Sequence, residues 1–92
     1  MLTVIAKIKA NQNSLEKVSN ELQRLVEPTR NEKGCIDYIL HQDNDDPSIF
    51  IFYENWETSV DLDAHMESEH FLECFKKIEG MFELDVNKLT KI

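Results

Sequence analysis

The segment Ile49–Trp56 constrains the fold most strongly, because it reads as a strand that is apolar on both faces. Its sequence, IFIFYENW, is rich in the β-branched and aromatic residues that are typical of strands. At a period of two, one face carries Ile49, Ile51 and Tyr53, and the other carries Phe50, Phe52 and Trp56. Such a strand must be covered on both sides, and a chain of 92 residues has little material for a second cover. The sequence therefore predicts that a second subunit covers one side.

Three further segments show the alternation of apolar and polar residues that predicts strands. They are Leu2–Ala10, Cys35–Gln42 and the segment that contains Phe82, Leu84 and Val86. Residues 43–48, with the sequence DNDDPS, have the composition of a turn. We therefore expect Cys35–Gln42 and Ile49–Trp56 to form a hairpin.

Two helical regions separate these strands. The first begins at a capping box of Asn13 and Glu16, Pro28 should end or kink it near Glu27, and Gly34 makes a firm stop. The second begins at Thr58, can restart at Ser68 and should end at Gly80. The apolar residues of both regions recur at helical spacing.

The resulting order, β-α-β-β-α-β, predicts a single domain over residues 1–92 with a ferredoxin-like α+β fold. In that fold, a four-stranded antiparallel sheet carries both helices on one face. The opposite face would then expose apolar side chains over a larger patch than monomers usually tolerate. We therefore expect a homodimer in which two sheets pack face to face as a dimeric α+β barrel.

The charge of the chain argues against two classes of partner. It carries 10 Lys and Arg against 18 Asp and Glu, which gives a net charge of −8, and no basic stripe. This balance argues against binding to nucleic acids or anionic membrane surfaces. The start, MLTVIAKIKA, has no signal-peptide pattern, and no apolar run is long enough to span a bilayer. A cytoplasmic location is the expectation.

Three sets of short motifs follow one another in a distinctive order. They are Pro28-Thr29-Arg30 with Gly34-Cys35, then Phe52-Tyr53-Glu54-x-Trp56, and then Ala64-His65 with His70. In this order and spacing, over almost the whole chain, the sequence resembles the antibiotic biosynthesis monooxygenase domain family, and in particular its small quinol-monooxygenase-like members. The resemblance implies a dimeric α+β barrel with a pocket between sheet and helices. For the oxygenase members it also implies catalysis without metal, flavin or haem.

His65 and Glu54 are the candidate catalytic residues. His65 follows the aromatic strand and has the near-neutral pKa that proton transfer requires, although a structural role weighs equally. Glu54 shares a strand face with Phe52 and Trp56. There it would have either a raised pKa or a hydrogen-bonded partner such as a histidine. The alternative for Glu54 is a salt bridge with Arg30 or a lysine.

His70 is a candidate substrate-binding residue, with packing beside Phe71 as the alternative. On one continuous helix, His65 and His70 would point about 140° apart, which does not match a helical zinc pair. A helix break at Ser68 would change that geometry. We predict no metal site and no cofactor.

The other candidate substrate-binding residues lie at the strand end and after the first helix. Phe52, Tyr53 and Trp56 could orient an aromatic ring, although Phe52 and Trp56 are more often core residues. The amide of Asn55 could hold an oxygen anion, or Asn55 could serve only as a turn residue. Arg30 could anchor an acidic or phosphorylated substrate, or only finish the first helix.

Together these residues favour a cofactor-independent monooxygenase that uses O2 on a small aromatic or quinol. His65 would remove a phenolic proton, assisted by Glu54 within hydrogen-bonding reach, either directly or through one water, on the wall of a cavity lined by Phe52 or Trp56. A second hypothesis is an isomerase of a small carbonyl compound that uses the same pair, with Arg30 as the anion anchor. A third is a non-catalytic protein that binds small molecules or serves in stress.

Overall fold

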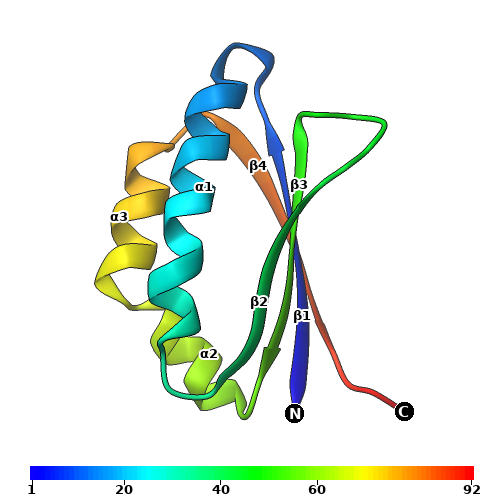
Figure 1. The fold of residues 1–92 in the computed structure, drawn as a ribbon, viewed down its shortest axis with the longest axis vertical. Helices are drawn as coiled ribbons and strands as arrows, with labels where there is room; N and C mark the ends of the chain where they lie inside the picture. Colours follow the sequence, from blue (N-terminus) through cyan, green and yellow to red (C-terminus); the bar gives the residue numbers. More distant parts are fainter.

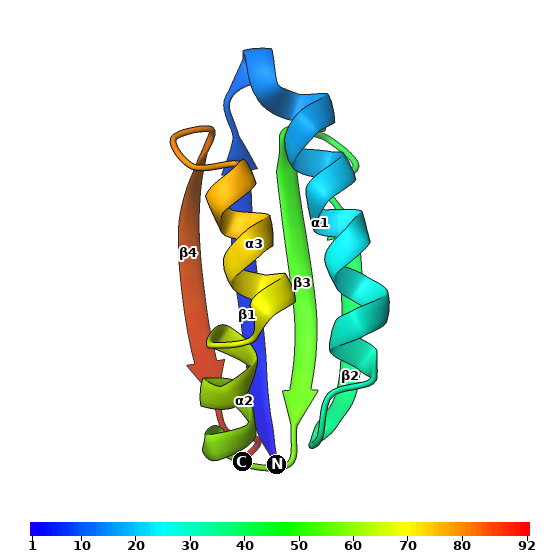
Figure 2. The ribbon, with the colours of Figure 1, turned by 90° about the vertical axis from the view of Figure 1, so that its left-hand side faces the viewer.

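The four strands form one antiparallel sheet in the order β2-β3-β1-β4, in a computed structural model that describes residues 1–92. The strands are β1 (Leu2–Ala10), β2 (Cys35–Gln42), β3 (Ile49–Trp56) and β4 (Phe82–Leu89). The helices are α1 (Leu15–Arg30), α2 (Ser59–Met66) and α3 (Glu69–Lys77), with a 3-10 turn over Gln12–Ser14. All three helices cover the same face of the sheet (Figures 1 and 2). The predicted ferredoxin-like α+β fold is confirmed.

The boundaries of α1 differ from the prediction at both ends. The 3-10 turn precedes α1, and Ser14 occupies its N-cap without a side-chain capping bond, so the predicted capping box at Asn13 is wrong. Pro28 does not end α1 near Glu27, because the helix continues through Pro28 to Arg30, still before the predicted firm stop at Gly34. A proline lacks one N–H donor, and in the last turn this removes only one helical hydrogen bond. Arg30 then donates from Nε to the carbonyl of Tyr38, which ties the helix end to β2.

The second helical region breaks into two helices where the sequence predicts a restart. Thr58 caps α2, since its Oγ1 accepts a hydrogen bond from the backbone N–H of Asp61. Ser68 caps α3, since its Oγ accepts from the N–H of Phe71 and donates to the carbonyl of His65. The chain therefore turns sharply between His65 and the first turn of α3. None of the helices has the length and apolar character needed to span a membrane.

The strand register sorts the side chains into a buried face and an open face. On the helix-covered face, Val4, Ala6 and Ile8 of β1 lie beside Glu54, Phe52 and Phe50 of β3, and all six are buried. On the helix-free face lie apolar side chains from all four strands: Ile5, Ile39, Ile51, Tyr53 and Leu89. Ile39 and Tyr53 are each 38% exposed, and Leu89 is 45% exposed. An uncovered apolar sheet face is what the pattern of β3 predicts.

Candidate active site

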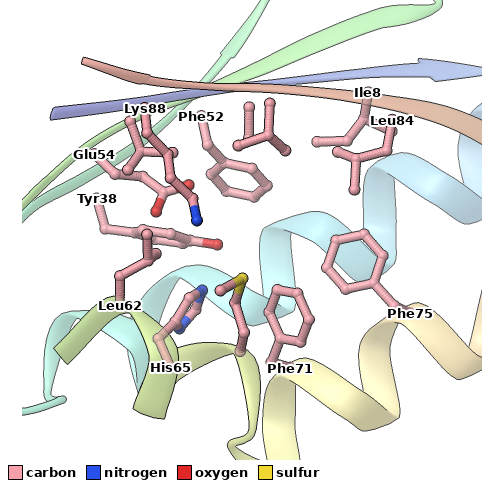
Figure 3. Close-up of a pocket in the computed structure, with 14 residues that line it drawn as sticks. Ile8, Tyr38, Phe52, Glu54, Leu62, His65, Phe71, Phe75, Leu84 and Lys88 are labelled. Atoms are coloured by element: carbon pink, nitrogen blue, oxygen red, sulfur yellow. The ribbon is translucent and has the colours of Figure 1, made fainter. Parts of the chain in front are cut away.

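A pocket lies between the helix-covered face of the sheet and helices α2 and α3 (Figure 3). Fourteen residues line it, of which eleven are hydrophobic. They are Val4, Ala6, Ile8, Tyr38, Phe52, Glu54, Leu62, His65, Met66, Phe71, Phe75, Leu84, Val86 and Lys88. We call this cavity the aromatic pocket. Its polar groups are few, as is typical of small-molecule sites.

The sheet register brings three of the polar groups to one level of the aromatic pocket. Val4 of β1 pairs with Glu54 of β3 and with Lys88 of β4, and Glu54 pairs with Tyr38 of β2. Side chains that lie opposite one another on neighbouring strands point to the same side of the sheet. Tyr38, Glu54 and Lys88 therefore form a row that faces the helices, and Figure 3 shows their polar atoms grouped at one end of the cavity.

His65 faces this row from the last turn of α2. Its side chain is only 2% exposed, and its Nδ1 lies 2.8 Å from Oε2 of Glu32. The ring packs against aromatic neighbours, with centroid distances of 4.9 Å to Trp56, 5.0 Å to Phe71 and 5.4 Å to Tyr38. The ring is thus fixed on several sides, and the nitrogen not bonded to Glu32 points toward the aromatic pocket (Figure 3).

The bond to Glu32 determines which nitrogen of His65 carries the proton. A carboxylate only accepts hydrogen bonds, so Nδ1 of His65 must be the donor. Burial lowers the pKa of His65, and this effect outweighs the opposing effect of Glu32. The ring is therefore neutral at pH 7, and Nε2 presents a free lone pair to the aromatic pocket. That is the arrangement of an oriented general base.

The same oxygen of Glu32 contacts a second histidine. Oε2 lies 2.6 Å from Nε2 of His70, and Oγ of Ser68 lies 3.2 Å from the same nitrogen. His70 is 29% exposed and Glu32 is 15% exposed, whereas His65 is enclosed. The break at Ser68 is what brings both rings to Glu32. We call Glu32, His65 and His70 the Glu32 cluster.

The sequence predicted that Glu54 has either a raised pKa or a hydrogen-bonded partner such as a histidine, and the structure supports a raised pKa. Burial raises the pKa of Glu54 to about 7, although a hydrogen bond donated by Trp56 Nε1 at 2.9 Å opposes the shift. The alternative salt bridge with Arg30 or a lysine does not form within 4.0 Å. Glu54 and His65 line the same cavity but make no direct hydrogen bond, because Trp56 and Glu32 are their respective partners. The predicted direct hydrogen bond is therefore wrong, and the predicted contact through one water stays a prediction.

Tyr38 supplies a hydroxyl group inside the aromatic pocket. Its ring stacks on Phe52 with a centroid distance of 4.6 Å, and its hydroxyl points into the cavity (Figure 3). Burial and the nearby Glu54 raise the pKa of Tyr38 well above its usual range. The hydroxyl thus stays protonated and can donate a hydrogen bond to a ligand.

Of the six residues predicted to bind substrate, only Phe52 lines the aromatic pocket. Trp56 does not line the aromatic pocket but packs against the ring of His65, which does. Tyr53 and Asn55 lie on the helix-free face, because side chains alternate along β3, and the Asn55 amide donates to Tyr53 and Asp37.

The two remaining candidates also lie outside the aromatic pocket. Arg30 borders a groove between α1 and β2, and its Nε is bonded to the carbonyl of Tyr38. His70 borders a second small cavity on the outer side of α1 and α3. Neither side chain is therefore placed to contact a ligand in the aromatic pocket.

Three polar residues of the site were not predicted. Tyr38 and Lys88 had a usable signal, because each continues the apolar alternation of its own strand: Tyr38 with Leu40, and Lys88 with Val86. Glu32 had none, since it lies in the turn between α1 and β2 and reaches residues more than 30 positions away.

The size of the aromatic pocket limits the ligand. Its volume is about 70 Å³ in the single chain, which is less than the roughly 150 Å³ of an engineered cavity that holds benzene. Leu84 and Val86, which line it on β4, are 49% and 43% exposed. A ring-sized ligand must therefore displace flexible side chains such as Met66 or extend toward β4.

Comparison with known proteins agrees with this architecture. Among curated sequences, the uncharacterized protein sll1783 of Synechocystis is 32% identical over 76 residues, which are 83% of this chain and 52% of that protein. The chain thus spans about half the length of that relative. The protein named "Putative monooxygenase YcnE" of Bacillus subtilis is 30% identical over 77% of this chain and 75% of its own length.

Solved structures are similar to this chain over nearly its full length. PA3566 from Pseudomonas aeruginosa is 36% identical and superposes with a TM-score of 0.94, covering 99% of this chain and 93% of that chain. A crystal structure of an antibiotic biosynthesis monooxygenase is 32% identical, also with a TM-score of 0.94, and covers 100% and 99% of the two chains. The family model for antibiotic biosynthesis monooxygenases matches residues 1–77. The chain therefore belongs to the antibiotic biosynthesis monooxygenase family.

Proposed function

We propose that this protein is a cofactor-independent monooxygenase that oxidises a small electron-rich aromatic compound, such as a quinol, with O2. The observation that carries the proposal is the free Nε2 of His65, held by Glu32 and directed into an apolar cavity. Membership of the family supports the reaction class. The apolar walls suit an aromatic ring and exclude the water that would compete for the base.

In the proposed reaction, Nε2 of His65 removes the phenolic proton of the substrate. The hydroxyl of Tyr38 and the ammonium group of Lys88 lie at the same end of the pocket and stabilise the resulting oxyanion. The electron-rich anion then reduces O2 directly. One oxygen atom enters the product, and the other leaves as water with two protons and two electrons that the substrate supplies.

Glu54 gives this scheme a second proton-transfer group. With a pKa of about 7 it exchanges a proton readily near neutral pH. In the scheme it relays a proton to the departing water and is reprotonated by the second proton that the substrate gives up, while His65 acts on the phenol. In this scheme the two groups act separately, whereas the sequence predicted that they act as a pair, directly or through one water.

The isomerase hypothesis is weakened because Arg30, its proposed anion anchor, lies outside the aromatic pocket. That hypothesis used Arg30 to hold a phosphate or carboxylate, but Arg30 lies on the outer side of α1 and β2. The eleven hydrophobic residues around the pocket also suit an aromatic ring better than a phosphorylated compound.

The test is oxygen uptake by metal-stripped protein with a panel of dihydroxynaphthalenes and anthrols. We expect enzyme-dependent uptake with at least one member, and a fall in kcat of about 10²- to 10⁴-fold in His65→Ala. His41→Ala removes an exposed histidine and serves as the matched control. Uptake no faster than autoxidation across the panel, or equal rates in His65→Ala and the parent, would refute the proposal.

A further inference from the structure

The Glu32 cluster holds two imidazole groups and one carboxylate around a single point. The ligand atoms of Glu32, His65 and His70 all lie within 4.8 Å of one another. The three residues come from the turn before β2, the end of α2 and the first turn of α3. On a continuous helix, His65 and His70 would point about 140° apart. The break at Ser68 removes this separation, and with it the reason to reject a metal site at these residues.

The distances between the ligand atoms of the Glu32 cluster are close to those between the ligand atoms of a zinc site. Ligand atoms of a tetrahedral zinc ion, at bonds of about 2.0–2.1 Å, lie roughly 3.3 Å apart. Oε2 of Glu32 lies 2.8 Å from His65 Nδ1 and 2.6 Å from His70 Nε2, which are hydrogen-bond distances. A retreat of Glu32 by less than about 1 Å would therefore make room for the ion.

Charge and access also favour a cation at this point. Glu32 has no lysine or arginine within 4.0 Å, and its partners are the two histidines alone. Glu21, by contrast, has Lys17, Arg24 and Lys77 around it. Glu32 and His70 are partly exposed, so an ion can enter from outside without passing through the aromatic pocket.

We propose that the Glu32 cluster is a binding site for Zn²⁺, and that the bound ion reverses the tautomer of His65. The ligands are Oε2 of Glu32, Nδ1 of His65 and Nε2 of His70, with water in the fourth position. Imidazole and carboxylate are ligands that zinc commonly takes. Zinc on Nδ1 displaces the proton from that nitrogen, and a neutral ring then carries its one proton on Nε2.

The consequence for catalysis rests on the proposed function. With a proton on Nε2, His65 presents a donor to the aromatic pocket and has no lone pair with which to accept a phenolic proton. Zinc would therefore act as an inhibitor of a metal-independent base. The binding and the tautomer are measurable without any substrate, so they remain testable if no quinol is turned over.

The first experiment measures zinc binding by calorimetry and equilibrium dialysis with metal-stripped protein. We expect one Zn²⁺ per chain, with affinity at least about tenfold weaker in Glu32→Gln and in His70→Ala. His41→Ala removes the histidine outside the cluster and should bind zinc as the parent does. Circular dichroism and melting establish that each variant is folded, and His70→Asn replaces His70→Ala if the latter unfolds.

The second experiment follows the imidazole nitrogens of ¹⁵N-labelled protein by NMR. Without zinc, Nε2 of His65 should resonate as an unprotonated ring nitrogen, and with one equivalent of zinc as a protonated one. No binding, or equal binding in the parent, Glu32→Gln and His70→Ala, would overturn the site. Zinc binding at the cluster with His65 Nε2 still unprotonated would overturn the tautomer reversal.

Discussion

At the scale of single residues, the site depends on the hydrogen-bond partners of His65 and Glu54. The ring of His65 is enclosed by Trp56, Tyr38 and Phe71, and its one hydrogen bond is with Glu32. That bond sets the tautomer, so under the proposed function Glu32 is a positioning residue that acts through His65. Glu54 instead accepts from Trp56 and keeps a proton more readily than an exposed glutamate because it is buried.

Replacing Glu32 with glutamine should reduce turnover through the tautomer of His65. An amide can donate to Nδ1, which would place the ring proton on Nε2, where the base must be free. Wrong-tautomer substitutions of this kind cost a triad protease about 10⁴-fold, and here we expect a fall in kcat of about 10²-fold or more with KM little changed.

Steady-state kinetics with a substrate from the oxygen-uptake panel would measure this effect. Glu27→Gln, an exposed glutamate of α1, is the matched control and should retain the parent kcat. A Glu32→Gln variant that changes KM alone would show that Glu32 does not act through the base.

The raised pKa of Glu54 predicts a pH-dependent effect of Glu54→Gln on stability. The pKa of Glu54 rises from 4.5 to about 7 on folding, so between these values the folded state keeps a proton that the unfolded state loses. This group therefore contributes less stability as pH rises through that window. A shift of this size corresponds to at most about 3 kcal/mol.

Urea unfolding at pH 5 and at pH 8 would measure the effect. The free energy of unfolding of Glu54→Gln, relative to the parent, should increase by about 1–3 kcal/mol between these pH values. Glu16→Gln on the exposed side of α1 controls for the loss of one negative charge. A relative stability that does not change between pH 5 and pH 8 would contradict the raised pKa.

At the scale of elements, the turn from α1 to β2 and the start of α2 hold the Glu32 cluster in place. Gly34 in that turn has φ +80°, and a Cβ there would lie 2.2 Å from the Asp61 carboxyl carbon. Asp61 in turn accepts a hydrogen bond from Thr58 at the start of α2. Only glycine satisfies both the backbone conformation and the close approach of the two elements.

Comparing Gly34→Ala with Gly80→Ala separates the cost of the positive φ from the cost of the close contact with Asp61. Gly80 has φ +78°, but a Cβ added there would meet nothing within 4 Å, so its substitution should cost only the backbone term of about 1–2 kcal/mol. Gly34→Ala should cost at least about 1 kcal/mol more, because Asp61 must leave its capping bonds. Thermal or urea unfolding measures the stability of both variants. Equal losses of unfolding free energy would show that the contact with Asp61 does not prevent a side chain at position 34.

At the scale of the whole molecule, sequence periodicity was sufficient to predict the sheet and the faces of most strand residues. The start of β2 is the exception, because the register shifts between Cys35 and Asp37 and leaves Ile36 exposed. The order of elements and the aromatic character of β3 led to the fold, and the restart at Ser68 was also predicted. The end of α1 was not, because the cost of Pro28 depends on how many helical hydrogen bonds remain to be lost.

The site was predicted in part: Glu54 and Phe52 from the strand pattern, and His65 from its residue type and the family resemblance. His65, Glu54 and Phe52 line the aromatic pocket as proposed from the sequence. Periodicity says nothing about the Glu32 contacts, because they join a turn to two helices that are distant in sequence. Asn55 lies on the same face as Tyr53, as the alternation of strand side chains predicts, and therefore away from the aromatic pocket.

The helix-free face predicts a homodimer. Ile5, Ile39 and Tyr53 lie side by side across three strands, and burying them against a second copy would remove a continuous apolar patch from water. Ile5→Lys should therefore shift the protein toward monomer in sedimentation at micromolar concentration. Leu72→Lys, on the exposed side of α3, should leave the dimer intact. A parent protein that sediments as a folded monomer would contradict this interpretation of the open face.

The central claim is that His65 enables a substrate anion to react with O2 without a cofactor, and labelling with ¹⁸O2 tests it most directly. Metal-stripped protein would be incubated with an active quinol, and oxygen consumed, hydrogen peroxide released and label in the product would be measured together. We predict one ¹⁸O atom per product, one O2 per turnover, no accumulated peroxide, and loss of this reaction in His65→Ala. Unlabelled product with stoichiometric peroxide, or labelling that is unchanged in His65→Ala, would contradict the claim.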